Sequence, residues 1–543
     1  MKDVNNSVDY ADCNEDTDPR HLLGLGMKRV NLRDSLLLAL VVLALTRPVA
    51  AQPMADLPSQ IGEQNASIGA SDPLIGPEGQ QMSWNQPPQS GAEIAAVNHT
   101  SQPLVSGGEG NSNSDNWLIS HWHNAGDPQV GIAREQAGPS VRGEKSEDKK
   151  DKKWYEKLSV RGYAQFRLNE TLFEEPGSAP PQHTGDRSVG DDQNFLIRRA
   201  RVIISGDVSD NLYVYLQPDF ASNVPGSPDA NQFTQIRDWY GDCYLDQEKV
   251  YRVRIGQSKI PYGWENLQSS SNRLPLDRND GLNSAVRNER DLGVFFYYTP
   301  EDAQDFFKSV LEEGLKGSGN YGTLGFGFYN GQGGSLQEQN DNMHFVARYT
   351  LPMQLESGQY LEAGVQGYTG EYTVLSSAIS PLGIGAPERP AGTLETGNRD
   401  GIRDERLAGS FIWYPQPFGF QSEWNVGSGP GLNDAQDEVV ERHLYGGYAM
   451  AMYRHETDCY GTFIPFVRFN RFRGGYKPER NSPFSDIDEW EIGTEWQFNP
   501  QMEFTAMYTI TERTNTVAVN EADALSYQQF DGQLLRMQFQ INY

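Results

Sequence analysis

A two-residue alternation of apolar and polar side chains recurs through residues 158–543, in runs of about ten residues. The segment "LSVRGYAQFRL" alternates from Leu158 to Leu168, and the final "LLRMQFQINY" repeats the pattern up to Tyr543. Side chains two residues apart in a β-strand lie on the same face of the sheet. Each run therefore predicts a strand with one apolar face and one polar face.

The only long apolar run, "SLLLALVVLALT", lies near the N-terminus and is too short to span a bilayer comfortably. Basic residues precede it and the small residues Val49, Ala50 and Ala51 follow it, as in a cleaved secretory signal. We therefore expect an extension of uncertain role at residues 1–26 and a signal peptide at residues 27–51. The Gln-, Asn-, Ser-, Gly- and Pro-rich composition that follows predicts a disordered spacer at residues 52–157.

The expected signal peptide and the alternation of apolar and polar side chains together favour an outer-membrane barrel over a soluble two-sheet sandwich. Sandwich strands also alternate, but here aromatic residues recur near the ends of the runs, and short turns alternate with long polar loops. Residues 158–543 are long enough for an all-β fold, a transmembrane antiparallel β-barrel of about 16 strands. The residues expected to face outward include Leu212, Val214, Leu216, Val253, Ile255, Met537, Phe539 and Ile541.

The stretch "NFLIRRARVIISGDV" places Arg198, Arg199 and Arg201 in one predicted strand. Guanidinium groups without partners are costly in a dry core, whereas the inner face of a wide barrel is in contact with water. Arg198 and Arg199 have opposite parity, so both fit only if the strand contains a β-bulge or if a subunit interface shields the outer face.

The segments "GYAQFR", "FLIRRARVIISGDVSDNLYVYLQPDFA", "IRDWYGDCYL", "VRIGQSKIPYGWENLQSSSNRLPLDR", "NERDLGVFF" and "FGFYNGQGG" follow one another along the chain. In their order and spacing they resemble the phosphate-selective porin O/P family, over most of residues 158–543. The resemblance implies a trimeric porin of sixteen strands, in which a ladder of arginines leads anions to a central constriction. It implies that Arg198 and Arg199 are the paired arginines, that Lys259 is the lysine after the "IGQ" strand, and that residues 269–290 narrow the pore.

Arginine suits a phosphate pathway because its planar guanidinium group can donate two parallel hydrogen bonds and stays charged. A series of weak sites lets an anion step from one to the next. The expected pathway residues are Arg161, Arg167, Arg198, Arg199, Arg201, Arg252, Arg254, Lys259, Arg348 and Arg468. On the inward loop, Arg273, Arg278, Arg287 and Arg290 are expected to face Asp277, Asp280 and Asp291 across the constriction.

Net charge opposes this interpretation, since residues 158–543 contain 31 lysines and arginines against 52 aspartates and glutamates. Anion preference therefore requires that the acidic side chains lie mainly in outer loops. Two alternatives stay open. One is a general or carbohydrate-preferring porin, with Tyr213 and Tyr215 contacting sugars. The other is a non-conducting barrel that serves as a surface anchor.

An enzyme is not expected. The segment "GSGNYG" at residues 317–322 fits a dinucleotide-binding glycine pattern, but a strand and no helix follows it. No cofactor, metal site or nucleic-acid partner is expected. The expected location is the bacterial outer membrane, and the expected partners are its lipid, small anionic solutes, two further copies in a homotrimer and the cell wall through the spacer.

Limited proteolysis should remove the spacer first, because disordered backbone is accessible to proteases. We expect a resistant fragment that begins near residue 158, identified by N-terminal sequencing. A resistant fragment that begins well before that residue would reveal a folded domain within residues 52–157.

Overall fold

The computed structural model describes residues 153–543 apart from residues 180, 187, 191–193, 221–233, 335, 380–386 and 519–524. The expected extension, the signal peptide and nearly all of the spacer lie outside the described residues. A short 3-10 turn, η1 (Trp154–Lys157), immediately precedes the first strand. No helix in the described part of the chain is both long and apolar enough to cross a membrane.

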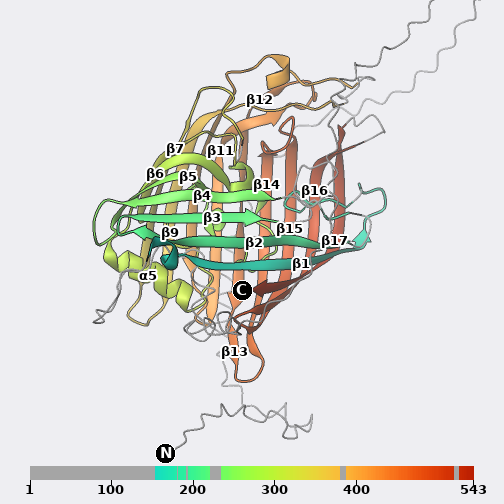
Figure 1. Ribbon diagram of the computed structural model, residues 1–543. Helices are drawn as coiled ribbons and strands as arrows, with labels where there is room; N and C mark the ends of the chain where they lie inside the picture. The colour runs from blue at the N-terminus through green and yellow to red at the C-terminus, as the bar shows by residue number, and fades with distance from the viewer. Residues whose placement is uncertain are drawn as a thin grey trace, which may run out of the picture. The chain divides into compact units, whose positions relative to one another are not determined.

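The strands form one closed antiparallel sheet (Figure 1). Its seam joins β1 (Ser159–Glu174) to β17 (Leu525–Asn542). The short β13 (His455–Thr457) pairs with β14 beside the end of β12, so the seventeen strands make a sixteen-stranded wall, as predicted. The remaining strands are β2 (Asn194–Ser209), β3 (Leu212–Asp219), β4 (Gln235–Tyr244), β5 (Tyr251–Lys259), β6 (Arg290–Tyr298), β7 (Leu324–Tyr329), β8 (His344–Gln354), β9 (Tyr360–Tyr372), β10 (Ile402–Trp413), β11 (Phe418–Leu432), β12 (Val439–Tyr453), β14 (Gly461–Gly475), β15 (Phe484–Asn499) and β16 (Met502–Ala518).

The seam continues to the last residue of the chain. Tyr543 accepts a backbone hydrogen bond from Gly162 at 2.6 Å and donates one back at 2.9 Å. A Cβ atom at position 162 would lie only 2.2 Å from the carbonyl oxygen of Arg201. Glycine at this position therefore allows the strands at the seam to approach one another.

The two faces of the wall are the ones that the alternation predicts. In β3, Leu212, Val214 and Leu216 are partly exposed, and they alternate with buried Tyr213 and Tyr215. The other residues predicted to face outward are also at least partly exposed on the outer face, namely Val253, Ile255, Met537, Phe539 and Ile541.

Residues 260–289, which connect β5 to β6, fold into the barrel, and we call this segment the inward loop. It contains α3 (Trp264–Leu267), α4 (Asp280–Asn283) and η2 (Arg287–Glu289). Glu423 of β11 accepts hydrogen bonds from the backbone N–H groups of Trp264 and Glu265, at 2.6 and 3.0 Å. Because these are the first N–H groups of α3, the carboxylate fixes the start of this helix to the wall.

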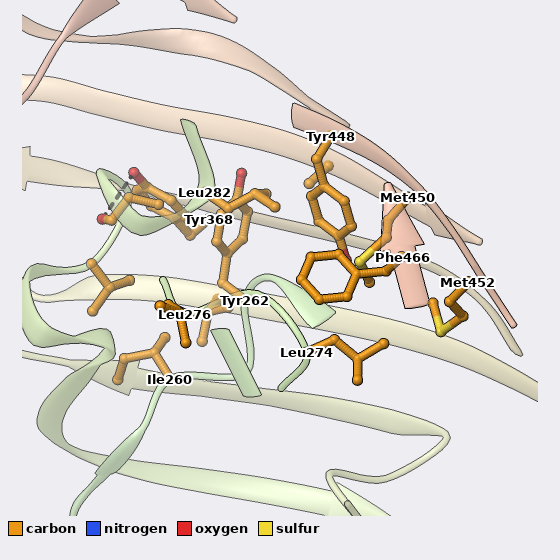
Figure 2. Close-up of a cluster of buried hydrophobic side chains, with 14 of the residues drawn as sticks. Ile260, Tyr262, Leu274, Leu276, Leu282, Tyr368, Tyr448, Met450, Met452 and Phe466 are labelled. Carbon is orange, nitrogen blue, oxygen red and sulfur yellow. Dashed lines mark hydrogen bonds between the residues drawn. The ribbon is translucent and has the colours of Figure 1, made fainter. Parts of the chain in front are cut away.

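Apolar side chains of the inward loop pack on one side of the wall (Figure 2). The loop contributes Ile260, Tyr262, Leu274, Leu276 and Leu282. The wall contributes, among others, Tyr368, Tyr448, Met450, Met452 and Phe466, from β9, β12 and β14. Removing this apolar surface from water holds the loop against β9, β12 and β14.

A second connection, between β6 and β7, enters the barrel from the opposite end. It begins with α5 (Glu301–Glu312), whose residues Phe306, Phe307 and Val310 cluster with Trp264 of the inward loop. Tyr414 belongs to the same cluster and is fully buried. This aromatic residue at the end of β10 therefore packs inside the protein rather than at the outer surface.

A β-bulge allows the two adjacent arginines, Arg198 and Arg199, to face the same side of the wall. Gln165 of β1 pairs with Arg199, and the next residue, Phe166, pairs with Ile197, so Arg198 is an extra residue in β2. Both arginines therefore turn inward, although they are adjacent in sequence. Of the two explanations that the sequence left open, the structure contains the bulge.

Deleting Arg198 should leave the barrel folded, because Ile197 and Arg199 would then pair with β1 without interruption. Deleting Val202, in the regular part of β2, should prevent folding, because it moves one half of the strand to the opposite face. The fraction of protein that keeps the folded electrophoretic mobility before heating measures both effects. Equal loss of folded protein in the two variants would contradict this account.

Candidate functional site

A cavity of about 120 Å³ lies between β2, β4 and the inward loop, and it is rich in arginine. Residues from two other connections, including Gly185 and Glu479, complete its lining. Among the residues that the structure describes, seven arginines and four carboxylates line it. The arginines are Arg198, Arg199, Arg201, Arg237, Arg273, Arg278 and Arg287, and the carboxylates are Asp219, Asp277, Glu289 and Glu479.

A second β-bulge supplies one of these arginines. Gln217 of β3 pairs with Asp238, and the next residue, Pro218, pairs with Ile236, so Arg237 is an extra residue in β4. Arg237 was not among the residues expected along the pathway. The signal that could have identified it is "IRDW", where two polar residues stand between two outward apolar ones, as in "IRRA" of β2.

Asp277 holds the inward loop to the seam of the barrel. Its carboxylate lies 3.1 Å from Arg167 of β1 and is also paired with Arg536 of β17. Arg198 and Arg199 of β2 lie at 3.8 and 4.0 Å. Burial alone would raise the pKa of Asp277, but the surrounding guanidinium groups outweigh burial and hold this pKa well below its ordinary value.

Glu289, at the other end of the inward loop, is likewise paired with several arginines. Its two carboxylate oxygens lie 2.9 Å from Arg278, 3.1 Å from Arg237 and 2.8 Å from Arg290. Burial would again raise the pKa of this carboxyl, and the three arginines lower it instead. Among the described lining residues the guanidinium groups outnumber the carboxylates by seven to four, so positive charge exceeds negative charge around the cavity.

Among the described residues, Arg199 and Arg273 are two cations of this group that no carboxylate approaches closely. Arg199 donates a hydrogen bond to the side-chain oxygen of Gln165 at 2.8 Å, while its nearest carboxylate is the one at 4.0 Å. Arg273 donates to the carbonyl oxygens of Pro275 and Leu276, and its Nη1 has no hydrogen-bond partner among the described residues. Both side chains line the cavity, so both can donate hydrogen bonds to an anion there.

Most other arginines expected along the pathway lie on the inner face, where carboxylates neutralise them. These pairs are Arg201 with Asp219, Arg252 and Arg254 with Asp242, Arg348 with Glu362, and Arg468 with Glu265 and Glu491. Arg161 instead donates to the hydroxyl of Ser205, and Lys259 donates to the carbonyl oxygens of Leu267 and Gln268. The arginines paired with carboxylates therefore contribute less net charge than a count of arginines suggests, whereas Arg161 and Lys259 bind neutral groups.

Two residues expected on the constriction loop belong to β6 instead. Arg290 begins that strand and pairs with Asp238 at 3.0 Å. Asp291 accepts hydrogen bonds from the backbone N–H groups of Gly331 and Gly333, at 2.7 and 2.9 Å. It therefore holds the β7–β8 connection and does not face arginines across the opening.

The remaining loop residue, Asp280 of α4, lies 3.6 Å from Arg513 of β16. Asp186, in the β1–β2 connection, was not predicted as a site residue. Its carboxylate lies 2.6 Å from Arg167 and 2.8 Å from Arg536. Arg536 could have been found, because it interrupts an apolar alternation just as the predicted arginines do. Asp186 lies in a polar connection with no repeating pattern, and nothing in the sequence distinguishes it.

A closed antiparallel wall of sixteen strands, narrowed by a loop that folds inward, defines a barrel of the outer-membrane porin type. The sequence profile of phosphate-selective porin O and P matches residues 181–543, so the chain belongs to this family. It is a porin of the bacterial outer membrane. Short turns of such barrels face the periplasm, which places the entry of β1, the exit of β17 and α5 on the periplasmic side.

Solved structures of other outer-membrane channels are similar to this chain. The trimer form of OmpT from Vibrio cholerae has 9% identity and a TM-score of 0.42, over 71% of this chain and 99% of that one. DcaP of Acinetobacter baumannii has 10% identity and a TM-score of 0.42, and Salmonella typhi OmpF in complex with daunomycin has 13% and 0.41; each comparison covers 71% of this chain and 97% of the other. No curated protein sequence matches the chain.

Replacing Asp277 by Asn should loosen the inward loop, because several buried guanidinium groups lose their shared partner. A loss of about 1–3 kcal/mol is expected, and trypsin should then cut within residues 260–289 roughly tenfold faster. The matched control is Asp207→Asn, which removes a carboxylate from a partly exposed pair with Lys249. Equal cleavage rates in the two variants would show that Asp277 does not hold the loop.

Proposed function

We propose that this porin conducts small anions such as phosphate, and that the arginine-rich cavity is its selectivity filter. The observation that supports the proposal is the surplus of guanidinium groups in this cavity, where Asp277 and Glu289 are each shared among several arginines. Arg199 and Arg273 line the cavity without a close carboxylate partner among the described residues, so both can donate hydrogen bonds to a passing anion.

Carboxylates lie on the inner face as well as in the outer connections, for example those of Asp242, Glu362 and Glu491, so anion preference depends on the arginines that these groups leave unbalanced at the cavity. In salt water, charges act mainly within a Debye length of about 8 Å. Carboxylates on exposed connections, such as that of Asp434, therefore have little effect at the filter. The arginines of the cavity act there at close range, with an attraction that decreases as salt increases.

Guanidinium groups rather than ammonium groups would bind the anion in this filter. Only five lysines occur from residue 158 onward, and no lysine lines the cavity. Lys259, expected on the pathway, binds carbonyl oxygens of the inward loop. The planar fork of arginine binds phosphate through two parallel hydrogen bonds, which favours oxyanions over chloride.

A carbohydrate-preferring pore is the second candidate. Tyr215 and Tyr240 stack with ring centroids 5.1 Å apart, and Tyr213 and Tyr244 belong to the same inner-face cluster. Aromatic faces suit the apolar faces of sugars. If this candidate is correct, an oligosaccharide added to the bilayer chamber will block the current more strongly than phosphate does.

We also propose a homotrimer, as the family resemblance implies, with residues 27–51 removed as a signal peptide and residues 52–157 reaching toward the cell wall. Light scattering of the purified protein in detergent tests the trimer. Single-channel recording tests conduction, because a barrel that serves only as an anchor would give no current.

The filter is tested by Arg199→Gln and Arg273→Gln in planar bilayers under a salt gradient. The unmodified pore should show the reversal potential of an anion-selective channel, and phosphate should reduce the chloride current. Each variant should lower the anion-to-cation permeability ratio by about twofold in dilute salt, the effect of one charge acting through water at short range.

Arg403→Gln is the matched control, because Arg403 lies on the outer wall with a side chain that is 59% exposed. It removes the same charge and should leave the ratio unchanged. A cation-selective reversal potential in the unmodified pore would refute anion preference. An unchanged ratio in both filter variants would refute the filter.

A further inference from the structure

The β6–β7 connection continues beyond α5 into a buried segment at residues 313–322, which we call the strap. Leu315 packs in the cluster around Trp264, and Lys316 is only 2% exposed. The other periplasmic connections are shorter, down to residues 500–501 between β15 and β16. The strap therefore places polar backbone and one cation inside the barrel, where a short turn would have sufficed.

The strap crosses the interior to the far side of the wall. The Nζ atom of Lys316 pairs with Glu495 of β15, which lies opposite β6 and β7 in the sixteen-stranded ring. Glu503 of β16 is close enough to interact electrostatically with both groups, and it accepts a hydrogen bond from Asn542 at 3.0 Å. One cation from the strap thus serves two inward carboxylates.

The strap also lies directly beneath the inward loop. Gln268 donates a side-chain hydrogen bond to the carbonyl oxygen of Lys316 at 2.6 Å, and Asn272 donates to that of Gly317 at 2.8 Å. On the other side, Arg252 of β5 donates to the carbonyl oxygen of Asn320 at 2.9 Å. An ion that passes the inward loop toward the periplasm therefore meets the strap next.

The backbone of Lys316 is unusual for its residue type. Its φ is +66°, in the left-handed region that favours glycine, and its neighbours at positive φ, Gly314, Gly319 and Gly322, are all glycines. A lysine costs more than glycine in this conformation. The position nevertheless carries the one side chain of the strap that can neutralise Glu495 and Glu503.

We propose that the strap is a second filter on the periplasmic side of the pore, and that Lys316 is its specificity-determining residue. Without Lys316, the exit from the arginine cavity would present two inward carboxylates and repel anions. With Lys316 in place, this part of the path carries at most one net negative charge. The inference rests on the proposed function, since a second filter requires a conducting pore.

The test compares Lys316→Gln with Glu495→Gln in planar bilayers at low salt. Both variants break the same ion pair, but they change the local charge in opposite directions. Lys316→Gln should shift the anion-to-cation permeability ratio toward cations by about twofold, and Glu495→Gln should shift it toward anions by about the same factor. The double variant should return close to the unmodified ratio, and all shifts should shrink in concentrated salt.

Lys308→Gln is the matched control, because Lys308 lies on α5 at the same mouth with a side chain that is 44% exposed. It should leave the ratio unchanged. If Lys316 only tethers the strap, both single variants will change the current in the same direction, and the inference is wrong. If the two single variants shift the permeability ratio in opposite directions but the unmodified pore has no anion preference, the strap filter is upheld and the proposed anion preference is refuted. If the pore does not conduct, both proposals are refuted.

Discussion

The ion pairs of Asp277 with arginines near the seam of the barrel position most of what lies inside it. Arg167 and Arg536 come from the first and last strands, so one carboxylate binds both sides of the closure. On its other side the inward loop presents apolar groups to β9, β12 and β14 (Figure 2). The loop therefore has a charged edge and an apolar edge, and each edge fits only one part of the wall.

The charge that matters inside this barrel is the net charge left when each arginine is counted together with its carboxylate partners. Arg254 and Asp242, for example, form two hydrogen bonds at 2.7 and 2.9 Å, and the guanidinium carbon lies 3.8 Å from the centre of the Tyr240 ring. Such an arginine is largely neutralised and adds rigidity to the wall. An excess of positive charge arises where arginines outnumber the carboxylates beside them, as among the described residues that line the cavity.

The alternation of the sequence was sufficient to predict the strands, their outward faces and the closure at Tyr543, because these depend on a period of two residues. It could not predict which arginines are paired, because pairing between strands depends on their register, as for Arg254 with Asp242, and pairing with the inward loop depends on a path without periodicity. Asp291 was misplaced for this reason: its carboxylate binds the backbone of Gly331 and Gly333. The strap was missed as well, because its glycine-rich sequence contains no repeating pattern that indicates where it folds.

The two bulges allow the charge of the channel to evolve independently of the barrel. Each adds one residue to a strand, at Arg198 or at Arg237, and leaves the facing of every other residue in that strand unchanged. An insertion or deletion at these points alters permeability without requiring compensating changes elsewhere in the wall. Strands are normally the elements that tolerate length changes least, and these two positions are exceptions within this wall.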